Sequence, residues 1–524
     1  MSESFDIAVI GSGFSGSLVA MALQQQGRRV LLLEQGRHPR FAIGESSTPL
    51  ANLWLEHFAI HNHLEGVVSL TQWGTWQREH PEIACGLKRG FTFYQHRFGE
   101  LFQDSDRHER QLLVAASPHA GIADTHWYRP DFDHHLVRQA LRVGVEYWDS
   151  VRIHEVERRE GRMQARLLQS GVEKEINVAL IVDATGPRGC LFRLMNLPEE
   201  PMPGIEPTQA LFAHFRDVDR SASLDEFKGG ASPPYAPDDA ALHHLFPGGW
   251  IWILHFNNGV TSAGAALTPG LAEELRASEG ASAWERLLER LPSVRRQFAN
   301  ATATTPFFHQ PRMPFLCAQA SGPGWVMLPS AQGFIDPMLS TGFPLTLLGM
   351  DRLVRGLQSS WGSESLTAMC ARVVDQSRAD LLRAASLVSE LYQSLADFPR
   401  FVALARLYFA VVSFSETEIR LGSADDVEAA ILLSSHPEFG PGLVALLQAI
   451  AGADAALVRE AVDRFIEPID VAGLLRQDRA NWFPVDAEDL KHAASKLNAS
   501  SEEIEGLLRR SGFQDRHGIE IPSC

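Results

Sequence analysis

Three closely spaced glycines near the start of the chain, Gly11, Gly13 and Gly16, limit the local fold more tightly than any other stretch. They follow an apolar run at residues 5–10 that is typical of a buried strand, and they precede a helix-like pattern at residues 17–23. In a strand, tight turn and helix of this kind, free backbone N–H groups at the start of the helix face the phosphates of a dinucleotide. We therefore predict a dinucleotide site whose first contacts are Gly11, Ser12, Gly13, Ser15 and Gly16.

A second apolar run supports this prediction. Residues 29–33 have the pattern of a second strand and end in Glu34, where a carboxylate accepts hydrogen bonds from an adenosine ribose. The glycine triplet alone would be weak evidence for a dinucleotide site, since a glycine-rich turn in some other α/β protein can have the same spacing. Strand, helix and acid in the correct order favour an α/β protein with a Rossmann-type domain.

Composition excludes several classes of function. A chain of 524 residues, 45% hydrophobic and 21% charged, can bury a large core. The formal net charge of −17 argues against nucleic acid as a partner, because phosphate binding needs clustered lysine and arginine. The five cysteines lack CxxC and zinc-ligand spacing, so we predict no metal site and no disulfide framework.

Targeting signals are absent from the sequence. Residues 1–3 lead directly into the first apolar run, without a basic stretch or a cleavable apolar core. No apolar run of about 18 residues, the length that crosses a membrane, occurs. We expect a cytoplasmic protein with no membrane span.

Four further motifs identify the dinucleotide. Gly44-Glu45-Ser46 follows the second strand, residues 179–187 form a strand that runs into an Ala-Thr-Gly turn, residues 250–252 read Trp-Ile-Trp, and residues 333–342 read Gly-Phe-Ile-Asp-Pro-Met-Leu-Ser-Thr-Gly. Together with the glycine triplet, these motifs closely resemble those of the reduced-FAD-dependent halogenases, over roughly residues 5–345. Nicotinamide-only dehydrogenases have no Gly-Glu-Ser loop, so the resemblance implies FAD.

The resemblance implies further cofactor contacts. In the family the Gly-Glu-Ser loop lies beside the isoalloxazine ring, an arginine before a helix approaches the cofactor, and a strand residue contacts the adenine through its backbone. The matching residues are Gly44, Glu45, Ser46, Arg129, Val151, Ser330, Asp336 and Phe343. Two alternatives remain: Arg129 as a surface arginine capped by Asp131 or Asp133, and Val151 as an ordinary strand residue.

The division of the chain is also implied by the resemblance. We expect residues 1–190 to form the first part of an FAD-binding domain of the monooxygenase and halogenase type, and residues 191–310 to form an inserted mixed β-sheet that binds substrate. Residues 311–345 should return to the FAD-binding domain. Residues 346–524, with long amphipathic patterns, should form a helical C-terminal extension.

An essential lysine of the family corresponds to Lys88. In these enzymes hypohalous acid must travel from the flavin to a separate compartment that holds the aromatic ring. Lys88 stands just before a strand in which Phe91 and Phe93 alternate with polar residues, as the family's lysine does. Burial would lower its pKa into a useful range for hydrogen-bonding hypohalous acid or forming a haloamine. The alternative is a pair of surface cations, Lys88 and Arg89.

The family's Trp-x-Trp motif corresponds to Trp250 and Trp252. There it crowds the space beside the flavin and hinders direct hydroxylation of the substrate. A buried aromatic strand would have the same pattern, since tryptophan and isoleucine are favoured in strands. Leu254 and His255 replace the usual Ile-Pro that follows.

The Ser-Thr-Gly turn corresponds to the family's halide site. Backbone N–H groups at a helix N-terminus suit an anion, so the resemblance implies Thr341 and Gly342 as the chloride or bromide pair, with Phe343 beginning a helix under the flavin. Tryptophan halogenases carry a glutamate where this chain has Leu339, which points away from tryptophan. Residues 255–258, and residues 327–330 in place of the usual Gly-Asp motif, are most similar to a pyrrolnitrin-pathway member that halogenates an aminophenyl-pyrrole.

The sequence therefore predicts a halogenase that uses reduced FAD, molecular oxygen and a halide on an electron-rich small molecule of phenol, pyrrole or indole type. No second glycine motif for NAD(P)H follows the first, so a separate flavin reductase would supply the reduced FAD. Two alternatives remain. One is an FAD-dependent monooxygenase or related oxidoreductase, and the other is a flavin-binding protein that has lost catalysis.

Overall fold

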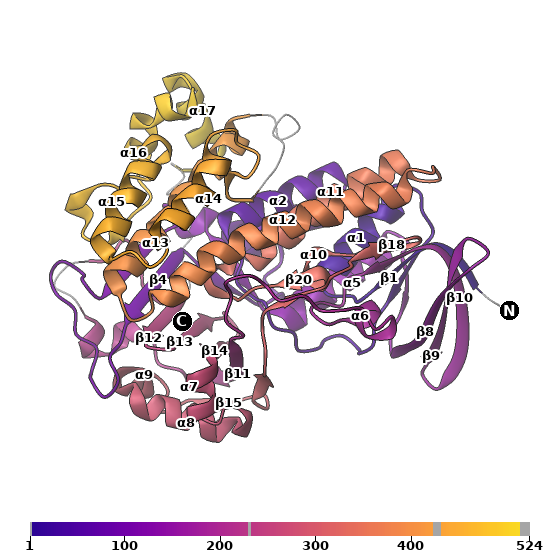
Figure 1. Cartoon of the computed structure of the whole chain (residues 1–524), viewed down its shortest axis with the longest axis horizontal. Helices are drawn as coiled ribbons and strands as arrows, with labels where there is room; N and C mark the ends of the chain where they lie inside the picture. The colour runs from indigo at the N-terminus through magenta and orange to yellow at the C-terminus, as the bar shows by residue number, and fades with distance from the viewer. Residues whose placement is uncertain (1–2, 229–231, 423–430, 514–524) are drawn as a thin grey trace.

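The glycine-rich start of the chain lies at the centre of an eight-stranded sheet in the computed structural model, which describes residues 3–228, 232–422 and 431–513. Its strands are β1 (Glu3–Ile10), β2 (Val30–Leu33), β7 (Glu146–Trp148), β8 (Val151–Arg159), β9 (Arg162–Gln169), β10 (Val172–Asp183), β18 (Ser321–Gly322) and β19 (Trp325–Met327). β1 lies between β10 and β2 and is parallel to both, as a dinucleotide-binding unit requires. β8, β9 and β10 form an antiparallel meander that projects at the right of Figure 1.

A nine-stranded sheet forms the second lobe. In spatial order it contains β15 (Thr302–Ala303), β11 (Gln209–Arg216), β14 (Thr261–Leu267), β13 (Gly249–His255), β12 (Ala241–Phe246), β4 (Gly90–Gln95), β5 (Gln111–Ala115) and β21 (Trp482–Phe483), with β16 (Phe308–Gln310) beside β11. The outer face of this sheet packs against α7 (Pro269–Glu274), α8 (Ala281–Arg290) and α9 (Pro292–Gln297) through a separate apolar core.

The composition of the second sheet corrects the predicted boundary at residue 190. β4 and β5 come from the first part of the chain, and β21 comes from the C-terminal extension. β4 is buried along almost its whole length and pairs in parallel with β12, with Phe91 level with Ala241. This pairing covers an edge of the inserted strands that would otherwise expose unpaired N–H and C=O groups.

Two pairs of short strands complete the β structure of the described residues. β3 (Cys85–Lys88) pairs with β6 (Asp124–Trp127), and β17 (Phe315–Leu316) pairs with β20 (Gly333–Phe334). The antiparallel register of β3 and β6 sets Lys88 level with Asp124. β19 joins the first sheet in parallel beside β10, so this later segment returns to the first lobe as predicted.

Helices cover the first sheet. They are α1 (Phe14–Gln25), α2 (Pro49–His61), α3 (Glu65–Val68), α4 (Trp73–Glu79), α5 (Arg129–Arg142), α6 (Cys190–Leu194), α10 (Pro329–Gln332), α11 (Gly342–Ser360) and α12 (Leu366–Gln393). α11 contacts α1 and α2 and lies beside α12, and Figure 1 shows these two long helices crossing the upper part of the molecule. α11 starts at Gly342, slightly before the boundary predicted at residue 346.

The remaining helices form the extension at the upper left of Figure 1: α13 (Phe398–Leu421), α14 (Phe439–Ile450), α15 (Ala455–Ile466), α16 (Ala487–His492) and α17 (Ser501–Arg510). Among the described residues, α13 alone is long and apolar enough to cross a membrane, with a mean hydropathy of 1.3 in its most apolar window. That window is 83% buried inside the protein, which is the pattern of a core helix. The α/β class, the two sheets and the helical C-terminal region agree with the predicted fold.

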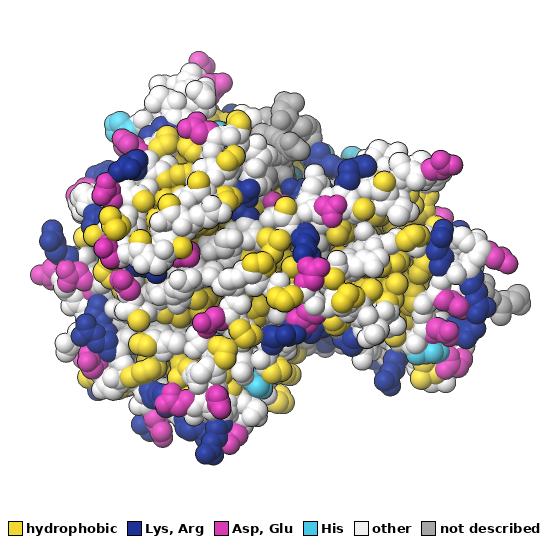
Figure 2. Space-filling model, in the orientation of Figure 1, with side chains coloured by type: hydrophobic (Ala, Val, Ile, Leu, Met, Phe, Trp, Pro, Cys, Tyr) yellow, Lys and Arg dark blue, Asp and Glu magenta, His cyan; other side chains and the backbone are white. Residues whose placement is uncertain are grey.

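The surface carries mixed charge. On the face shown in Figure 2, basic and acidic side chains are interspersed over both lobes, and the basic ones form no continuous patch there.

Candidate functional site

A cavity of about 1360 Å³, hereafter the first cavity, opens between the two sheets. Its wall combines the glycine turn, the end of β2, the Gly44–Ser46 loop, parts of β11 and β13, and much of the segment from Pro329 to Thr346. The volume exceeds the roughly 300–1,000 Å³ of most small-molecule sites, so a dinucleotide fits. The predicted cofactor contacts that line it are Gly11, Gly13, Ser15, Glu34, Gly44, Glu45, Ser46, Arg129, Val151, Ser330, Asp336 and Phe343.

The glycine turn is closed too tightly for side chains. Gly11 has a left-handed φ of 97°, and a Cβ on Gly16 would lie 1.8 Å from the Gly11 carbonyl oxygen. Gly16 therefore lies behind the cavity wall, where it lets α1 approach β1. No side chain caps α1 at Gly13, so the N–H groups at the start of this helix are available to an anion.

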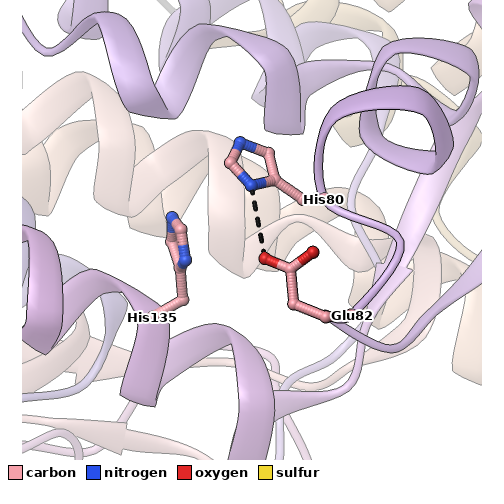
Figure 3. Close-up of side chains that lie close together, drawn as sticks. All are labelled: His80, Glu82 and His135. Atoms are coloured by element: carbon pink, nitrogen blue, oxygen red, sulfur yellow. Dashed lines mark ion pairs between the residues drawn. The ribbon is translucent and has the colours of Figure 1, made fainter.

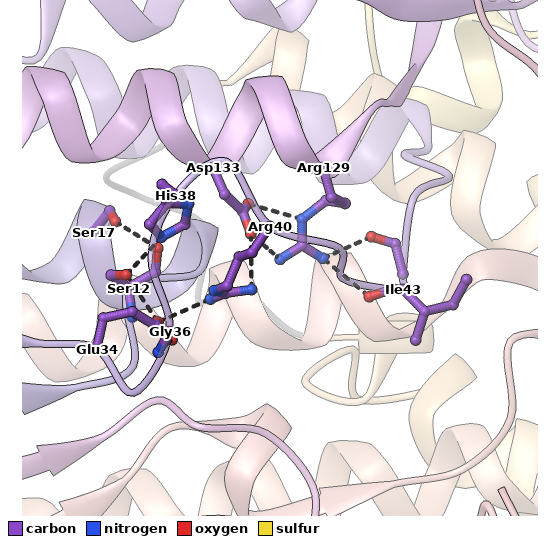
Figure 4. A network of polar contacts seen from close by, with 10 residues as sticks. Ser12, Ser17, Glu34, Gly36, His38, Arg40, Ile43, Arg129 and Asp133 are labelled. Carbon is purple, nitrogen blue, oxygen red and sulfur yellow. Dashed lines mark hydrogen bonds and ion pairs between the residues drawn. The ribbon is translucent and has the colours of Figure 1, made fainter. Parts of the chain in front are cut away.

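Glu34 is held rigidly at the edge of the first cavity (Figure 4). Its Oε2 accepts hydrogen bonds from the Ser12 N–H at 3.0 Å, the Ser12 hydroxyl at 2.9 Å and Arg40 Nη2 at 3.0 Å, and its Oε1 accepts one from the Gly36 N–H at 2.9 Å. Burial by itself raises the pKa of Glu34, but Arg40 and the two N–H donors lower it to about 2. Ser12, predicted as a cofactor contact, therefore supports Glu34 from behind and does not line the cavity.

Arg129 fixes the Gly-Glu-Ser loop from the start of α5 (Figure 4). Its Nε and Nη2 each donate to a different oxygen of Asp133 at 2.8 Å, and its Nη1 donates to the carbonyls of Ile43 at 3.1 Å and Gly44 at 2.8 Å. The guanidinium is thus paired with Asp133, as one alternative had it. It is also buried and lines the first cavity, so it is not a surface arginine.

Glu45 and Val151 contribute to this wall in different ways. One oxygen of Glu45 lies 2.8 Å from His214 Nε2, whereas the other is buried and has no hydrogen-bond partner among the described residues. Val151 begins β8, and its N–H donates to the carbonyl of Glu34 at 2.9 Å. Ser330 lies in the short helix α10, close to the return of the chain from β19.

The turn before α11 has a strained backbone. Leu339 and Ser340 have φ of 63° and 54°, a left-handed conformation that costs a non-glycine residue about 1–3 kcal/mol. α11 begins at Gly342 without a side-chain cap, so the N–H groups of its first turn have no partner within the helix. Thr341 and Gly342 both line the first cavity. The turn therefore presents unpaired donors to the cavity, which suits an anion.

Phe343 is locked in place by other aromatic rings. It stacks on Trp127 with ring centroids 4.4 Å apart and contacts Phe14 at 5.0 Å. Its ring therefore gives this side of the first cavity a flat, apolar floor.

A hydrogen-bonded chain joins the Trp-x-Trp strand to the same turn. Trp250 Nε1 donates to the Tyr392 hydroxyl at 2.9 Å, which donates to Asp336 Oδ2 at 2.6 Å. The other Asp336 oxygen accepts the Met338 N–H at 2.8 Å. Burial raises the pKa of Asp336 to about 6. Asp336, predicted as a cofactor contact, thus has its carboxyl group committed to the protein, while Trp250 and Trp252 line the first cavity.

Lys88, the predicted catalytic residue, is completely buried at the end of β3. Its Nζ donates to Ser46 Oγ at 2.9 Å and to the Ser47 carbonyl at 2.5 Å, and lies 3.9 Å from the centroid of the Phe91 ring. Burial lowers the pKa of Lys88, against the opposing charge of Asp124. The lowered pKa was predicted from sequence, and the alternative of a surface cation at Lys88 is wrong.

A second cavity, of about 470 Å³, lies close to Lys88. Its wall contains residues of α2, β4, β5 and α13, together with parts of the chain after Val471. Ser46, which accepts a hydrogen bond from Lys88, lines the first cavity, whereas Phe91, under the same Nζ, lines the second. Lys88 lines neither cavity itself; it is a buried titratable group with one neighbour in the lining of each.

Four side chains at these cavities were missed by the sequence analysis: Asn52, Asp124, Tyr392 and Tyr408. Tyr408 lines the second cavity and donates to the Leu339 carbonyl at 3.0 Å, so it ties α13 to the strained turn. Asn52 and Asp124 line the same cavity and bond to each other at 2.8 Å. The sequence offered one indication of this group, because Asp124 is an acidic residue close to the His-Trp-Tyr-Arg stretch. Nothing in the sequence indicated Asn52.

The sequence predicted no metal site, and the fold brings together three side chains of the types that can ligate a metal. His80, Glu82 and His135 have ligand atoms within 4.8 Å of one another in the described structure (Figure 3). Burial and the neighbouring His80 lower the pKa of His135 to about 4, which keeps it neutral. None of the three lines either cavity, so the cluster has no place in the site described above. The four cysteines within the described residues are free, and Cys524 lies outside them.

The first cavity fits FAD in its donors and acceptors. The free N–H groups after Gly13 suit a pyrophosphate, and the ionised Glu34 suits ribose hydroxyls. The unpartnered Glu45 oxygen is a buried acceptor that a ring N–H of an isoalloxazine would satisfy. Together with the flat face of Phe343, these groups match the chemistry of a flavin dinucleotide.

Comparisons with known sequences agree with this fit. The model of a family described as FAD dependent oxidoreductase matches residues 6–332. Monodechloroaminopyrrolnitrin halogenase PrnC of Pseudomonas fluorescens is 27% identical over 78% of this chain and 71% of its own length. Tetracycline 7-halogenase of Kitasatospora aureofaciens is 26% identical over 77% of this chain and 72% of its own length.

Solved structures show the same fold. Halogenase PltM in complex with phloroglucinol and FAD has a TM-score of 0.70 at 21% identity, covering 97% of this chain and 98% of that chain. The chondrochloren halogenase CndH has a TM-score of 0.56 at 21% identity, covering 88% and 97%. The predicted FAD-binding fold and the resemblance to flavin-dependent halogenases are both confirmed.

Proposed function

We propose that this chain, which belongs to the family of FAD-dependent oxidoreductases, is a flavin-dependent halogenase that places chlorine or bromine on an electron-rich aromatic or heteroaromatic small molecule. The observation that carries the proposal is the position of Lys88. It is a buried amine with a lowered pKa that contacts Ser46, which lines a cavity that fits FAD, and Phe91, which lines a second, smaller cavity.

Residues of the first cavity bind the cofactor and the halide. When bound, reduced FAD together with molecular oxygen supplies the oxidising power that converts a halide ion into hypohalous acid. The glycine turn and Glu34 hold the adenosine half, and Arg129 holds the Gly44–Ser46 loop against the ring. The N–H groups of Thr341 and Gly342 hold the halide beside it, because an anion there meets donors and no acidic side chain.

Lys88 then controls the halogen. Because burial disfavours the ammonium form, the neutral amine is accessible near neutral pH, and it can accept a hydrogen bond from hypohalous acid or take up the halogen as a haloamine. The aromatic acceptor occupies the second cavity, close to Lys88. The halogen therefore reaches the ring without passing through bulk water.

Hydroxylation is the alternative function, and two features disfavour it. An aromatic hydroxylase must bring its substrate directly beside the flavin. Here Trp250 and Trp252 occupy the wall of the first cavity, and the hydrogen bond from Trp250 to Tyr392 holds that wall in place. The second cavity, where we expect the acceptor, shares no lining residue with the cavity that fits the flavin.

The electron supply and location are part of the same proposal. A separate flavin reductase delivers the reduced FAD, since the sequence has no second glycine motif for NAD(P)H. We expect the enzyme to work in the cytoplasm, where such reductases and small aromatic metabolites are available. The isolated chain should oxidise NADH hardly at all.

One experiment separates the candidate functions. The protein is mixed anaerobically with reduced FAD, then given air, bromide or chloride, and a panel of phenols, pyrroles and indoles, and the products are identified by mass spectrometry. A halogenated product supports the proposal. A hydroxylated product, or rapid NADPH consumption by the isolated chain with an aromatic compound, would assign it to the monooxygenases. Flavin reoxidation without any product would indicate lost catalysis.

A further inference from the structure

The inner end of the second cavity carries two hydrogen-bond acceptors without donors. Asp124 is 6% exposed, and its Oδ1 accepts a hydrogen bond from Asn52 Nδ2 at 2.8 Å. Its Oδ2 and the Asn52 Oδ1 are both buried and have no partner among the described residues. Both residues line the second cavity. The wall of the cavity thus contains two acceptor oxygens that a donor from a bound molecule would satisfy.

Unsatisfied acceptors at such a depth need an explanation. Leaving a buried polar group unpaired costs about 1–3 kcal/mol, and most buried polar groups in folded proteins have partners. Two other polar side chains of this wall are engaged: the Thr48 hydroxyl caps α2, and the Tyr408 hydroxyl donates to Leu339. The rest of the lining mixes apolar side chains such as Leu53 and Phe91 with charged ones such as Glu416 and Arg420, which pair with each other. Apolar walls with directed polar groups are the pattern of a small-molecule site.

We propose that Asn52 and Asp124 select an aromatic acceptor that bears an O–H or N–H on or in its ring, and that they hold it by accepting that hydrogen. This inference rests on the proposed halogenase function and names its substrate class: phenols and N–H heteroaromatics rather than fully alkylated rings. Asp124 also receives the proton of that group as the ring reacts.

In the proposed reaction Lys88 handles the halogen and Asp124 handles the proton of the substrate's O–H or N–H group. The register of β3 and β6 sets the two residues level with each other on adjacent strands. The ring carbon ortho or para to the donor forms a bond to the halogen, while the halogen–oxygen bond of hypohalous acid breaks and its electron pair stays on oxygen, which leaves as water after taking the proton that the same ring carbon releases. As the donor proton moves to Asp124, the ring gains electron density. The reacting carbon then loses its hydrogen, and Asp124 returns the proton to the oxygen or nitrogen of the product.

Charges around Asp124 set its proton affinity. Burial raises its pKa, the Lys88 side chain lowers it, and Glu416 of α13 raises it. Arg420 of α13, which lies against Glu416 at 2.8 Å and 3.9 Å from Glu56 of α2, lowers it. The net effect is an elevated pKa, so Asp124 is a stronger proton acceptor than an exposed aspartate. Asn52, uncharged, orients the carboxylate through Oδ1.

The test compares two probes, phloroglucinol and its trimethyl ether, which are both electron-rich and differ in the O–H groups. With reduced FAD and bromide, wild-type kcat/KM should favour phloroglucinol, and Asp124→Asn should lower this preference by about 10²-fold, the smaller end of the loss of a positioned proton acceptor. Asn52→Ala should lower it less. Calorimetry without flavin should show weaker phloroglucinol binding to Asp124→Asn.

A pH series isolates Asp124 from Lys88. Loss of the neutral Lys88 amine at low pH affects both probes, whereas protonation of Asp124 affects only phloroglucinol. The ratio of the two kcat/KM values should therefore fall with decreasing pH in the wild type and be flat in Asp124→Asn. Asp351→Asn, a buried aspartate on α11 that lines neither cavity, is the matched control and should keep the wild-type ratio at every pH.

Each outcome decides between the claims. If the wild type halogenates both probes equally, or if Asp124→Asn keeps the preference and the pH-dependent ratio, the role of Asp124 is overturned while the halogenase function stands. If no halogenated product forms with any probe although FAD binds, both fail. FAD affinity and thermal stability of Asp124→Asn, measured in parallel, identify a variant that merely unfolds, and Asn52→Ala then carries the comparison of probes.

Discussion

The two cavities are lined by different kinds of structural element. The first is lined largely by turns, backbone N–H groups and residues that stand close together in the sequence, such as Gly11–Ser15, Gly44–Ser46 and Asp336–Phe343. The second is lined by side chains from α2, β4, β5, α13 and the region after Val471, which are hundreds of residues apart. A dinucleotide shared by many enzymes can be held by backbone geometry. An acceptor that distinguishes one enzyme from another needs particular side chains, and these come from separate elements.

Loss of Lys88 should have the largest effect, because its side chain contacts the lining of both cavities and is the proposed carrier of the halogen. Lys88→Ala should lower product formation by roughly 10²- to 10⁴-fold, the loss typical of a positioned proton-transfer group. FAD affinity, measured by quenching of flavin fluorescence, should be unchanged. Lys88→Met, which keeps the buried volume, should behave in the same way. If the methionine variant lost FAD affinity as strongly as it lost product formation, the role of Lys88 would be cofactor binding and not halogen transfer.

The Gly16→Ala change should damage only the first cavity. Its Cβ would overlap the Gly11 carbonyl oxygen at 1.8 Å, and the strain of about 1–3 kcal/mol corresponds to roughly a 5- to 150-fold weaker FAD affinity. Gly270→Ala is the control, since nothing lies within 4 Å of that position. Phloroglucinol binding, measured by calorimetry without flavin, should be normal in both variants. A matching loss of phloroglucinol affinity in Gly16→Ala would contradict the independence of the two cavities.

The halide site can be tested through the backbone of α11. Gly342→Pro removes one N–H donor, and the loss of a charge-assisted hydrogen bond of about 1.5–3 kcal/mol should raise the bromide requirement roughly ten- to a hundredfold. Gly342→Ala keeps the donor and meets no neighbour within 4 Å, so it should be mild, as should Thr341→Ala. FAD affinity should be measured on each variant. An unchanged FAD affinity indicates that only the N–H donor is lost, whereas a lowered one indicates that the whole turn is displaced. Crystals soaked in bromide should show an anomalous peak at the two nitrogens, and a peak elsewhere would exclude this site.

Acid should remove the contribution of Glu34 to the first cavity. Its folded-state pKa, about 2, lies below the usual 4.5, so its stabilising effect is complete above about pH 4.5 and is lost as the pH falls toward 2. Glu34→Gln should therefore lower the melting temperature at pH 7, and the difference from the wild type should vanish near pH 2. Its FAD affinity at pH 7 should fall by about tenfold. A constant difference in melting temperature across this range would assign Glu34 a purely steric role.

Tyr392→Phe should change activity least. It removes a hydrogen bond behind the wall of the first cavity and leaves every proposed contact to a ligand in place. Asp336 would lose one donor and Trp250 its acceptor, which should lower the free energy of unfolding by about 1–3 kcal/mol in urea denaturation. The bromide requirement should rise less than in Gly342→Pro. Tyr408→Phe, which cuts the corresponding link at the second cavity, should change phloroglucinol affinity more than bromide requirement. The reverse pattern would show that the turn depends on α13 rather than on β13.

The sequence predicted most of the first cavity, because its chemistry is local. The glycine spacing, the acid at Glu34 and the turn before Gly342 each reveal a backbone arrangement within a few residues. Lys88 was identified by its place before an aromatic strand, and burial then lowers its pKa as expected. The resemblance implied a separate compartment for the aromatic ring, but the side chains that form the second cavity were not predicted, because residues such as Asn52 and Asp124 are 72 residues apart in the sequence.

The second sheet was predicted only in part for a related reason. A strand pattern shows that β4 is a strand, but the pairing of β4 with β12 joins segments separated by many other elements. Periodicity in a sequence reports which face of a strand is buried and not which strand lies beside it. Ser12 and Asp336 show the same limit at the scale of side chains. Both stand in motifs that face the first cavity, yet their polar groups bond to Glu34 and Tyr392 instead.

The short strand β21 has a consequence for how such enzymes can diverge. Trp482 and Phe483 pair in parallel with Leu113 and Val114 of β5, so a segment near the far end of the chain is fastened to a strand from its first quarter. Recombination between relatives that exchanged only the C-terminal helices would bring a foreign β21 against a resident β5. New acceptor preferences should therefore be inherited as matched pairs of segments, or arise by point substitutions such as those at Asn52, rather than by exchange of one contiguous block.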